Sequence, residues 1–346
     1  MLYAKIKYRN NLGGMHMKIL VVGGAGYIGS HAVKQLRENQ IDVIVIDSLE
    51  TGHIESVPSD VPFYQVDIRD KTAVKEILEK ENVDGVIHFA ANSLVGESMT
   101  NPLKYYNNNV GGSESLLEAL IETGVKYIVF SSTAATYGEI TTMPITENMT
   151  TCPTNTYGET KLAIEKMLKW THSAHDLNYV CLRYFNVAGA DFSGTIGEAH
   201  TTETHLIPLI LQVPLGQRPH ITVFGQDYPT EDGTCIRDYI HVTDLVNAHI
   251  LALKYLMNGG KSNIFNLGSN SGYSVLEMIE AARKVTGHPI PLQIGERRAG
   301  DPALLIASSE KAKRILGWEP KYTAIEEIIA SAWKWHQAHP HGYKEV

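Results

Sequence analysis

The segment KILVVGGAGYIG, residues 18–29, decides the fold that we expect. Its first five residues form a short apolar run rich in β-branched side chains, which predicts a buried strand. The glycines follow at once, and Ile28–Glu38 then has apolar residues at helical spacing. This order suits a bound pyrophosphate, because bare amides and a helix N-terminus stabilise its charge. Gly23, Gly26 and Gly29 are the candidate positions, although a glycine-rich turn alone is weak evidence.

An acidic residue lies where a dinucleotide would need it. Asp47 follows the next expected strand, Asp42–Ile46, and comes 21 residues after Gly26. A carboxylate there can accept from both adenosine ribose hydroxyls and would repel a 2′-phosphate, which favours NAD over NADP. The alternative is a structural turn with an exposed Asp47. We favour the cofactor because the strand, the loop and the acidic residue agree.

Strands and helices alternate along the first half of the chain. The expected strands are Lys18–Val22, Asp42–Ile46, Gly85–Ala91, Lys126–Ser132 and Tyr179–Phe185, and the expected helices are Ile28–Glu38, Lys71–Lys80, Gly111–Thr123 and Tyr157–His172. Continuous apolar strands between helices predict a parallel sheet covered on both faces. With right-handed crossovers this is a doubly wound, Rossmann-like α/β fold.

The rhythm breaks after about Asn186, where segments become shorter and richer in proline. Helices are expected again at Val242–Met257, Val275–Thr286 and Ala324–His336. We therefore expect an NAD-binding domain over residues 17–185 and a smaller C-terminal α/β region over 186–346 for the substrate, partly interleaved with the first. Residues 1–16 are interpreted as a tag or extension, because a strand begins directly after Met17.

Composition excludes several classes of protein. The 346 residues are 43% hydrophobic, and 30 basic against 38 acidic residues leave a net charge of −8, which argues against nucleic-acid or anionic-membrane binding. No apolar run approaches the ~20 residues that span a bilayer, and no secretory signal is visible. Three distant cysteines, Cys152, Cys181 and Cys235, indicate free thiols in a reducing compartment. The histidines show no HExxH pattern, so we expect a cytoplasmic protein without a structural metal.

A tyrosine and a lysine form the first candidate catalytic pair. Tyr157 and Lys161 lie four residues apart on an expected helix, so both side chains share one face. A tyrosine has an ordinary pKa of ~10, and a nearby Lys⁺ or an oxidised nicotinamide favours the tyrosinate. The spacing is weak evidence by itself, because Tyr3 and Lys7 match it too. Position favours Tyr157, which follows a strand ending in Ser131-Ser132-Thr133.

Other strand ends offer further candidates with open alternatives. Thr133 would hydrogen-bond a substrate hydroxyl beside Tyr157, or would cap a turn. Asp67 follows another short strand and would bind an adenine amino group, or would cap the next helix from solvent. Phe89, Ala90 and Ala91 would place small side chains beside the cofactor, and they would also pack in the core.

These residues resemble the extended short-chain dehydrogenase/reductases. Within that family the sequence is most similar to the 4-epimerases of UDP-galactose and UDP-glucose. The similarity includes GGAGYIGSH, VIHFAA, VGES, RYFNVAGA and RRAGDPA, and above all FGQDYPTEDGTCIRDYIHVTDL over Phe224–Leu245. It covers essentially everything from Met17 to the C-terminus. The long block at Phe224–Leu245 is much more specific than the glycine loop or the Tyr157/Lys161 spacing.

The resemblance implies a mechanism and the residues for it. Tyr157 would remove the proton of the sugar 4-hydroxyl with help from Thr133, and Lys161 would hold the nicotinamide ribose. The C4 hydride would pass to tightly held NAD and return after the 4-keto sugar has rotated. The implied cofactor contacts beyond the glycines are Tyr27, Ile28, Asp47, Asp67, Ile68, Phe89, Asn109 and Phe185. The implied nucleotide-sugar contacts are Asn186, His205, Leu206, Phe224, Arg237, Arg298 and Asp301. A homodimer is also implied, with Gly111–Thr123 and Tyr157–His172 as candidate interface helices.

Four positions depart from the family pattern, among them Val22 in place of a Thr and Ser93 where some relatives have a Lys. His205 replaces an Asn on the uridine side, and Leu305 falls where relatives carry Tyr or a small residue facing the sugar 2-substituent. Because Leu305 is smaller than Tyr, we hypothesise partial activity on UDP-N-acetylglucosamine. Without the family context, Arg237 and Arg298 would be read as surface or ion-pairing arginines.

Rival functions remain. A nucleotide-sugar 4,6-dehydratase needs an additional acid/base pair after the strand-end serine, and residues 132–136, Ser-Thr-Ala-Ala-Thr, contain no carboxylate. A UDP-uronate enzyme is a second rival, disfavoured by the Phe224–Leu245 block. A non-catalytic NAD-sensing protein would be expected to lose Tyr157 or Lys161, and both are present.

Overall fold

The computed structural model describes residues 17–298 and 301–343. The expected tag or extension, residues 1–16, lies outside the described residues. Among those that are described, no helix is long and apolar enough to cross a membrane. Cys152 is exposed and Cys181 and Cys235 are buried, and all three are free thiols, as expected.

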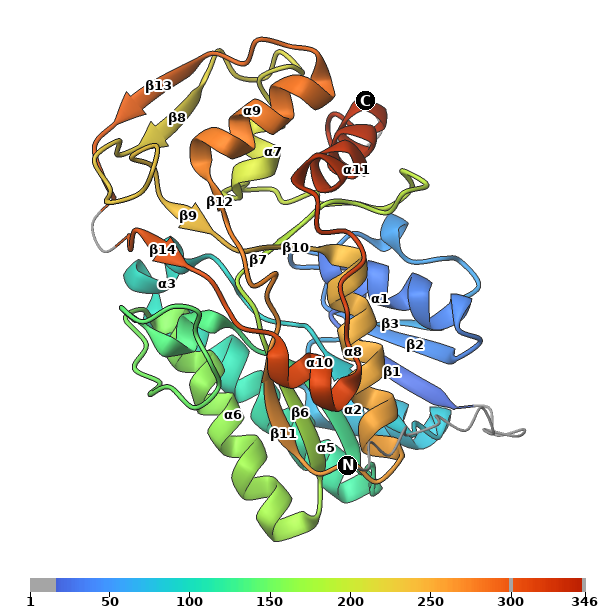
Figure 1. Cartoon of the computed structure of the whole chain (residues 1–346). Helices are drawn as coiled ribbons and strands as arrows, with labels where there is room; N and C mark the ends of the chain where they lie inside the picture. The colour runs from blue at the N-terminus through green and yellow to red at the C-terminus, as the bar shows by residue number, and fades with distance from the viewer. Residues whose placement is uncertain (1–16, 299–300, 344–346) are drawn as a thin grey trace, which may run out of the picture.

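A seven-stranded parallel sheet forms the centre of the larger region (Figure 1). Its strands are β1 (Lys18–Val22), β2 (Asp42–Asp47), β3 (Phe63–Gln65), β4 (Gly85–His88), β5 (Tyr127–Ser131), β6 (Asn178–Arg183) and β11 (Asn263–Asn266). The strand order is β11-β6-β5-β4-β1-β2-β3, and every pairing is parallel. The expected Rossmann-like α/β fold is confirmed. In this order β1 lies between β2 and β4, so the topology switches direction there.

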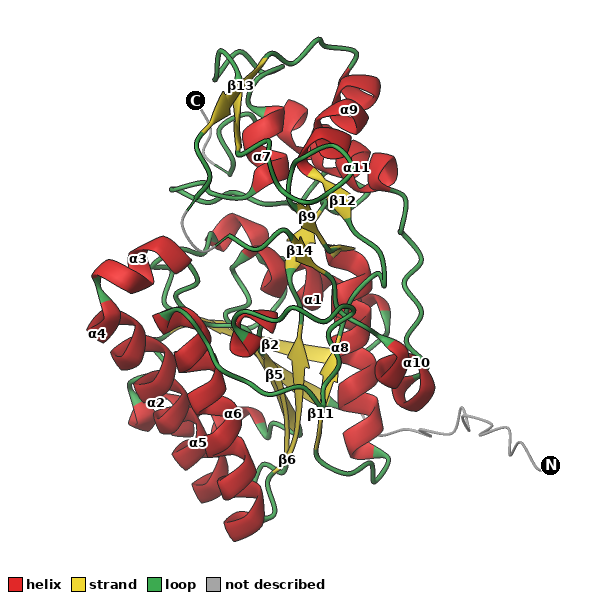
Figure 2. Ribbon diagram, turned by 60° about the vertical axis from the view of Figure 1, so that its left-hand side comes forward, coloured by secondary structure: helices red, strands yellow, loops and turns green. Residues whose placement is uncertain are grey.

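Helices cover both faces of the sheet (Figure 2). On one face are α1 (Tyr27–Glu38), α8 (Val242–Met257) and α10 (Glu310–Leu316). On the other face are α2 (Lys71–Glu81), α5 (Gly112–Thr123) and α6 (Thr156–His175). Alternate residues of each strand feed two cores: Ile19 and Val21 pack toward α1 and α8, and Leu20 and Val22 pack toward α2 and α5. This period of two explains why the strands read as continuous apolar runs.

The smaller region begins at β7 (Asn186–Ala188) and sits beyond the ends of the strands of the large sheet (Figure 1). Its core packs α7 (Leu206–Leu211), α9 (Val275–Thr286) and α11 (Ile325–Ala338) around Ile207, Met278 and Ile328. Its strands form three small sheets: β7 with β10 (Tyr239–His241), β8 (Ile221–Phe224) with β13 (Leu292–Gly295), and β9 (Ile236–Arg237) between β12 (Tyr273–Ser274) and β14 (Leu304–Leu305).

Several short elements were not expected from the sequence. They are η1 (Ile54–Ser56), α3 (Val95–Thr100), α4 (Pro102–Tyr105), a π-helix (Tyr106–Gly111) and η3 (Ala134–Tyr137). Two expected strands also end early. β4 stops at His88, because Phe89 and Ala90 turn to bond the carbonyl of Val22 at the end of β1. β6 stops at Arg183, since the chain leaves the sheet toward β7.

Candidate active site

The glycine loop lies at the switch point, between the carboxyl ends of β1 and β4. Gly23 has φ +82°, and a Cβ there would lie 2.6 Å from the amide nitrogen of Ala90. A Cβ on Gly29 would lie 2.0 Å from the carbonyl oxygen of Gly23. Both glycines are therefore required by the packing of the protein itself. Because neither glycine has a side chain, the loop and the start of α1 can pack closely against the end of β4.

Gly26 differs from its neighbours, because the nearest atom to its Cβ would be the carbonyl oxygen of Gly23 at 3.4 Å. The fold alone does not demand a glycine at this position. Gly26 is also the N-cap of α1, and no side chain caps it. An open space beside bare helix N–H groups fits a diphosphate, so these residues suit the expected dinucleotide.

Asp47 ends β2 and reaches back to this loop. Its carboxylate accepts from the amides of Ala25 at 2.9 Å and Leu49 at 2.8 Å. Burial raises the pKa of Asp47, and the two amide hydrogen bonds oppose that shift. The carboxylate is thus oriented at the edge of the glycine loop, where the sequence predicted it.

Asp67 lies further out on the same side. Arg69 donates to both of its carboxylate oxygens, and this hydrogen bonding lowers the pKa of Asp67. Its neighbour Ile68 is buried and fills the space beside Gly112, where a Cβ would come within 2.6 Å of it. Asp67 is not a helix cap, because Asp70 caps α2 instead.

The other expected cofactor residues surround the same loop. Tyr27 donates to the carbonyl of Gly189 at 2.5 Å, and Ile28 packs on the core below α1. The ring of Phe89 packs at a tilt against that of the buried His249, with ring centres 4.8 Å apart. Asn109, in the π-helix, is fully buried and donates to the carbonyl of Asn92 and the hydroxyl of Thr160. Asn109 therefore connects the end of β4 to α6.

Tyr157 lies in the first turn of α6, where Asn155 caps the helix. The side chain of Thr133, at the carboxyl end of β5, hydrogen-bonds that of Tyr157. Burial raises the pKa of Tyr157 to about 12, and the bond to Thr133 opposes this shift. Thr133 also caps η3 by accepting from the amide of Ala135 at 3.1 Å. The turn-capping alternative for Thr133 is thus observed, and its hydrogen bond to a substrate hydroxyl stays a prediction.

Lys161 lies one helical turn after Tyr157 and is 3% exposed. Its ammonium donates to the carbonyl of Ser131 at 2.9 Å. Burial lowers the pKa of Lys161 to about 7, although Glu165 opposes the shift. The structure therefore brings Tyr157, Lys161 and Thr133 together at the end of β5.

Sequence reasoning missed a buried ionic network behind this triad. Glu165 accepts from Arg183 at 2.9 and 2.5 Å and from Ser132 at 2.5 Å. A second chain runs from Tyr184 to Ser131 at 3.0 Å and on to His249 at 2.7 Å. These residues hold the end of β5 that carries Thr133. Their spacing in the sequence gave no local signal.

The residues expected to bind a nucleotide sugar form a second group. Arg237 lies on β9 opposite Leu305 of β14 and pairs with Asp301 at 3.2 Å. Arg298 stacks over the exposed ring of Phe224 at 4.1 Å. Leu305 shares an apolar cluster with Phe185 and with Ala134, the residue after Thr133. This second group therefore adjoins the triad.

Asn186 and the residues around α7 complete the expected set. Asn186 donates to the carbonyl of Asp238, next to Arg237, at 3.1 Å. Leu206 opens α7, and His205 is its N-cap. Although burial opposes it, Glu198 and Glu203 raise the pKa of His205 to about 10. His205 thus sits in an ionic cluster that the sequence analysis did not identify.

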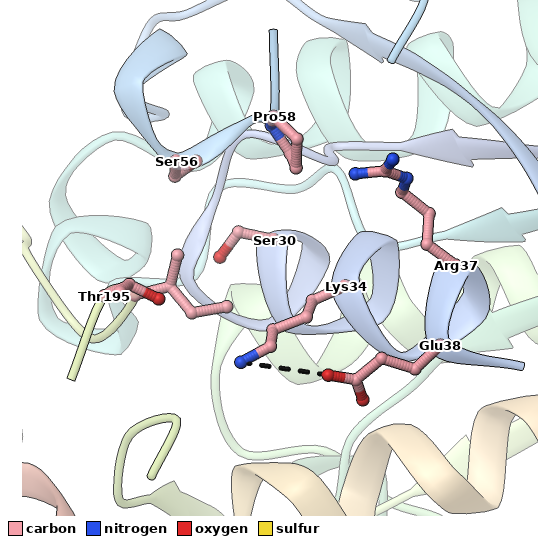
Figure 3. A pocket seen from close by; sticks show the side chains of 8 residues that line it. Ser30, Lys34, Arg37, Glu38, Ser56, Pro58 and Thr195 are labelled. Atoms are coloured by element: carbon pink, nitrogen blue, oxygen red, sulfur yellow. Dashed lines mark ion pairs between the residues drawn. The ribbon is translucent and has the colours of Figure 1, made fainter. Parts of the chain in front are cut away.

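A separate pocket lies on the outer side of α1 (Figure 3). Lys34 and Glu38, one turn apart on α1, pair at 3.9 Å along one side of it. The remaining lining residues are Ser30, Arg37, Ser56, Pro58, Thr195 and Ile196. None of the predicted site residues lines it, so this pocket is distinct from the candidate active site.

Comparison with known proteins gives consistent results. The model of the NAD dependent epimerase/dehydratase family matches residues 19–268. A UDP-glucose 4-epimerase of Halalkalibacterium halodurans is 61% identical over 327 residues, which are 94% of this chain and 98% of that protein. A crystal structure of a UDP-glucose 4-epimerase, 58% identical, superposes with a TM-score of 0.93 over 95% of this chain and 100% of the other. That of the Brucella ovis enzyme in complex with NAD is 44% identical, with a TM-score of 0.90 over 92% and 98%.

Proposed function

Because the chain belongs to the NAD-dependent epimerase/dehydratase family, we propose that it interconverts UDP-galactose and UDP-glucose. It is an isomerase that uses NAD. The observation that carries this assignment in the structure is the meeting of Tyr157, Lys161 and Thr133 at the end of β5. In the sheet, only β4 separates β5 from β1, which leads into the glycine loop.

The residues at the switch point fit NAD. The space beside Gly26 and the uncapped start of α1 would take the diphosphate, and Asp47 would accept from the ribose hydroxyls. The other proposed contacts are Gly23, Tyr27, Ile28, Gly29, Asp67, Ile68, Phe89, Ala90, Ala91, Asn109, Lys161 and Phe185. When bound, NAD would accept a hydride from C4 of the sugar and return it to the opposite face.

The triad supplies the proton chemistry. Tyr157 takes the proton of the sugar 4-hydroxyl, and Thr133 hydrogen-bonds the tyrosine oxygen and the same hydroxyl. Lys161 is placed to hold a ribose and to add positive charge near Tyr157. Thr133 and Lys161 are buried, which would limit the access of water to the carbon that reacts. No carboxylate lies in η3, where a dehydratase would need one.

The second group would hold the nucleotide sugar. Arg237 and Arg298 match phosphate oxygens in geometry and charge. Phe224 and Leu206 offer apolar faces, while Asn186, His205 and Asp301 offer polar atoms at the boundary of the two regions. Leu305 would lie against the sugar ring, because it packs beside Phe185 and Ala134.

We also propose a homodimer in the cytoplasm. Large apolar side chains are exposed on neighbouring helices: Met99 on α3, Leu103 on α4 and Trp170 on α6 are 58, 78 and 69% exposed. Joining α5 and α6 to their copies in a second chain would cover part of this surface. Sedimentation of the wild type and of Trp170→Glu tests the interface, and a wild-type monomer would contradict it.

The activity is tested by incubating the purified chain with UDP-galactose, with no NAD added, and following the sugars by NMR. We expect UDP-glucose to form, and Tyr157→Phe to slow its formation by on the order of 10²–10⁴-fold while NAD stays bound. A 4-keto-6-deoxy product would show a dehydratase instead. No product even with added NAD would show a binding protein.

A further inference from the structure

Four side chains of one loop converge just before α7. Glu198, His200, Glu203 and His205 each direct one ligand atom inward, and these atoms all lie within 4.8 Å of one another. Glu198 is 4% exposed. The two histidines both use Nδ1. Carboxylates and imidazoles gathered in this way are the donor set that binds borderline divalent metals.

The distances match the edges of a small tetrahedron. Nδ1 of His205 lies 2.8 Å from Oε1 of Glu198 and 3.1 Å from Oε1 of Glu203. Nδ1 of His200 lies 3.2 Å from Oε1 of Glu198 and 3.3 Å from Oε2 of Glu203. In a tetrahedral zinc site with bonds of ~2.0–2.1 Å, neighbouring ligand atoms are about 3.3 Å apart. The four groups thus need only small shifts to share one ion.

Hydrogen-bond geometry at Glu198 provides independent evidence. Its Oε1 is buried and has no hydrogen-bond partner, although two imidazole nitrogens lie within 3.2 Å. The two imidazole nitrogens hydrogen-bond Glu203 instead, so the buried oxygen of Glu198 faces them without a hydrogen bond of its own. Glu203 is braced differently, because its Oε1 accepts from the amides of Thr204 and His205 at 2.8 and 2.7 Å. Such outer hydrogen bonds orient carboxylate ligands in metal sites.

We propose that Glu198, His200, Glu203 and His205 bind one Zn²⁺ ion in a four-coordinate structural site. Four protein ligands close the coordination sphere, so the ion has no open position for catalysis. Bonding through Nδ1 leaves Nε2 of His205 for the substrate contact proposed above. The expectation of no structural metal is revised here. The sequence analysis looked for HExxH, whereas these ligands are spaced as Glu-x-His-x-x-Glu-x-His.

The place of the cluster indicates what the ion would do. The carbonyl of Glu198 accepts from Trp335 of α11 at 3.0 Å, and that of Ala199 lies 2.7 Å from Nε2 of His53. The ring of His200 lies edge-on to the ring of Tyr27 at the start of α1, and the two ring centres are 6.4 Å apart. The ion would fix the loop that joins the larger region to α7. It would thereby hold His205 and Leu206 in place.

The test uses the full-length chain without a polyhistidine tag, which would itself bind zinc. The protein is stripped with EDTA, and zinc is added back from a chelator-buffered solution. We expect about one tightly bound Zn²⁺ per chain and a Tm that rises by on the order of 5–10 °C with Zn²⁺ but not with Mg²⁺. Co²⁺ in place of Zn²⁺ should give the visible absorption of a four-coordinate nitrogen and oxygen site.

Variants identify the ligands. Glu203→Gln and His200→Asn should each weaken zinc binding by at least ~10-fold, and His175→Asn, an exposed histidine on α6, should not change it. The wild-type titration does not depend on how well the variants fold. No zinc beyond weak surface binding, with a Tm unaffected by EDTA and by zinc, would overturn the proposal. The cluster would then consist of histidine–glutamate ion pairs.

Discussion

The ammonium nitrogen of Lys161 lies 5.9 Å from the centre of the Tyr157 ring, one helical turn away. Burial acts on the two groups in opposite directions, lowering the pKa of Lys161 to about 7 and raising that of Tyr157 to about 12. Each shift disfavours the charged form. Lys161 alone therefore does not make Tyr157 a base at neutral pH. The positive charge of an oxidised nicotinamide is the remaining source of stabilisation for the tyrosinate.

The pKa of Lys161 predicts how stability depends on pH. In protein freed of nucleotide, Lys161 loses its proton near pH 7 when folded and near 10.5 when unfolded. Between these values the unfolded chain binds more protons, so this lysine's contribution to stability rises with pH by about 1.4 kcal/mol per unit. Below pH 7 the contribution is constant.

Urea unfolding at pH 7 and 9 measures this effect. The free energy of unfolding of the wild type, minus that of Lys161→Met, should grow over this range. Lys166→Met replaces an exposed lysine on the same helix. The free energy of unfolding of the wild type, minus that of Lys166→Met, should be the same at pH 7 and pH 9. Equal behaviour of the two variants would show that Lys161 is not deprotonated in the folded protein.

Thr133 should tune the base. Thr133→Ala removes the hydrogen bond to Tyr157 and should lower kcat by about 10²-fold, while Thr133→Ser should keep most of the activity. Because that bond lowers the pKa of Tyr157, its loss should move the acidic limb of the kcat/KM profile to higher pH. A slower Thr133→Ala enzyme with an unmoved limb would indicate only the loss of the η3 cap.

The glycine loop offers a matched pair of variants. Gly26→Ala adds a methyl group whose nearest neighbour is 3.4 Å away, so the Tm should change little while NAD binding weakens. Gly29→Ala would place its methyl group 2.0 Å from a backbone oxygen, so that variant should lose stability. Calorimetry and NAD titration separate the two effects. Normal NAD affinity in Gly26→Ala would place the diphosphate elsewhere.

Most of the sheet could be predicted from the sequence, because its strands are buried runs between glycine or polar breaks. The bounds of β1, α8 and α9 agree with the expected ones. The short strand β11 was missed, since its four residues pair with β6 about 80 positions earlier in the chain. The π-helix was missed as well, because its three consecutive asparagines are poor helix formers.

The sequence could indicate some features of the candidate site but not others. The glycine loop and the pair Tyr157/Lys161 are local patterns, so the sequence could indicate them. The bonds of Glu165 to Arg183 and Ser132 depend on how α6 packs on the sheet, which local spacing does not reveal. The pairing of Arg237 with Asp301 likewise follows from the register of β9 and β14. The functional roles of these residues stay predictions.

Leu305 should decide which sugars are accepted. Its half-buried side chain packs near Phe185 and is smaller than the Tyr of some relatives. We expect slow turnover of UDP-N-acetylglucosamine by the wild type, its loss in Leu305→Tyr and a gain in Leu305→Ala, with UDP-galactose as the control substrate. Coupled assays of both substrates measure this ratio. No detectable turnover of the N-acetylated sugar by the wild type would refute the idea.

In the proposed reaction, the same hydrogen leaves C4 of the sugar and returns to it on the opposite face. The most direct test is to convert UDP-galactose carrying deuterium at C4, in ordinary water and without added cofactor, and to locate the label in the product by NMR. We expect UDP-glucose with the deuterium still at C4. Exchange of the label with solvent, or its appearance at C6 of a deoxy sugar, would contradict it.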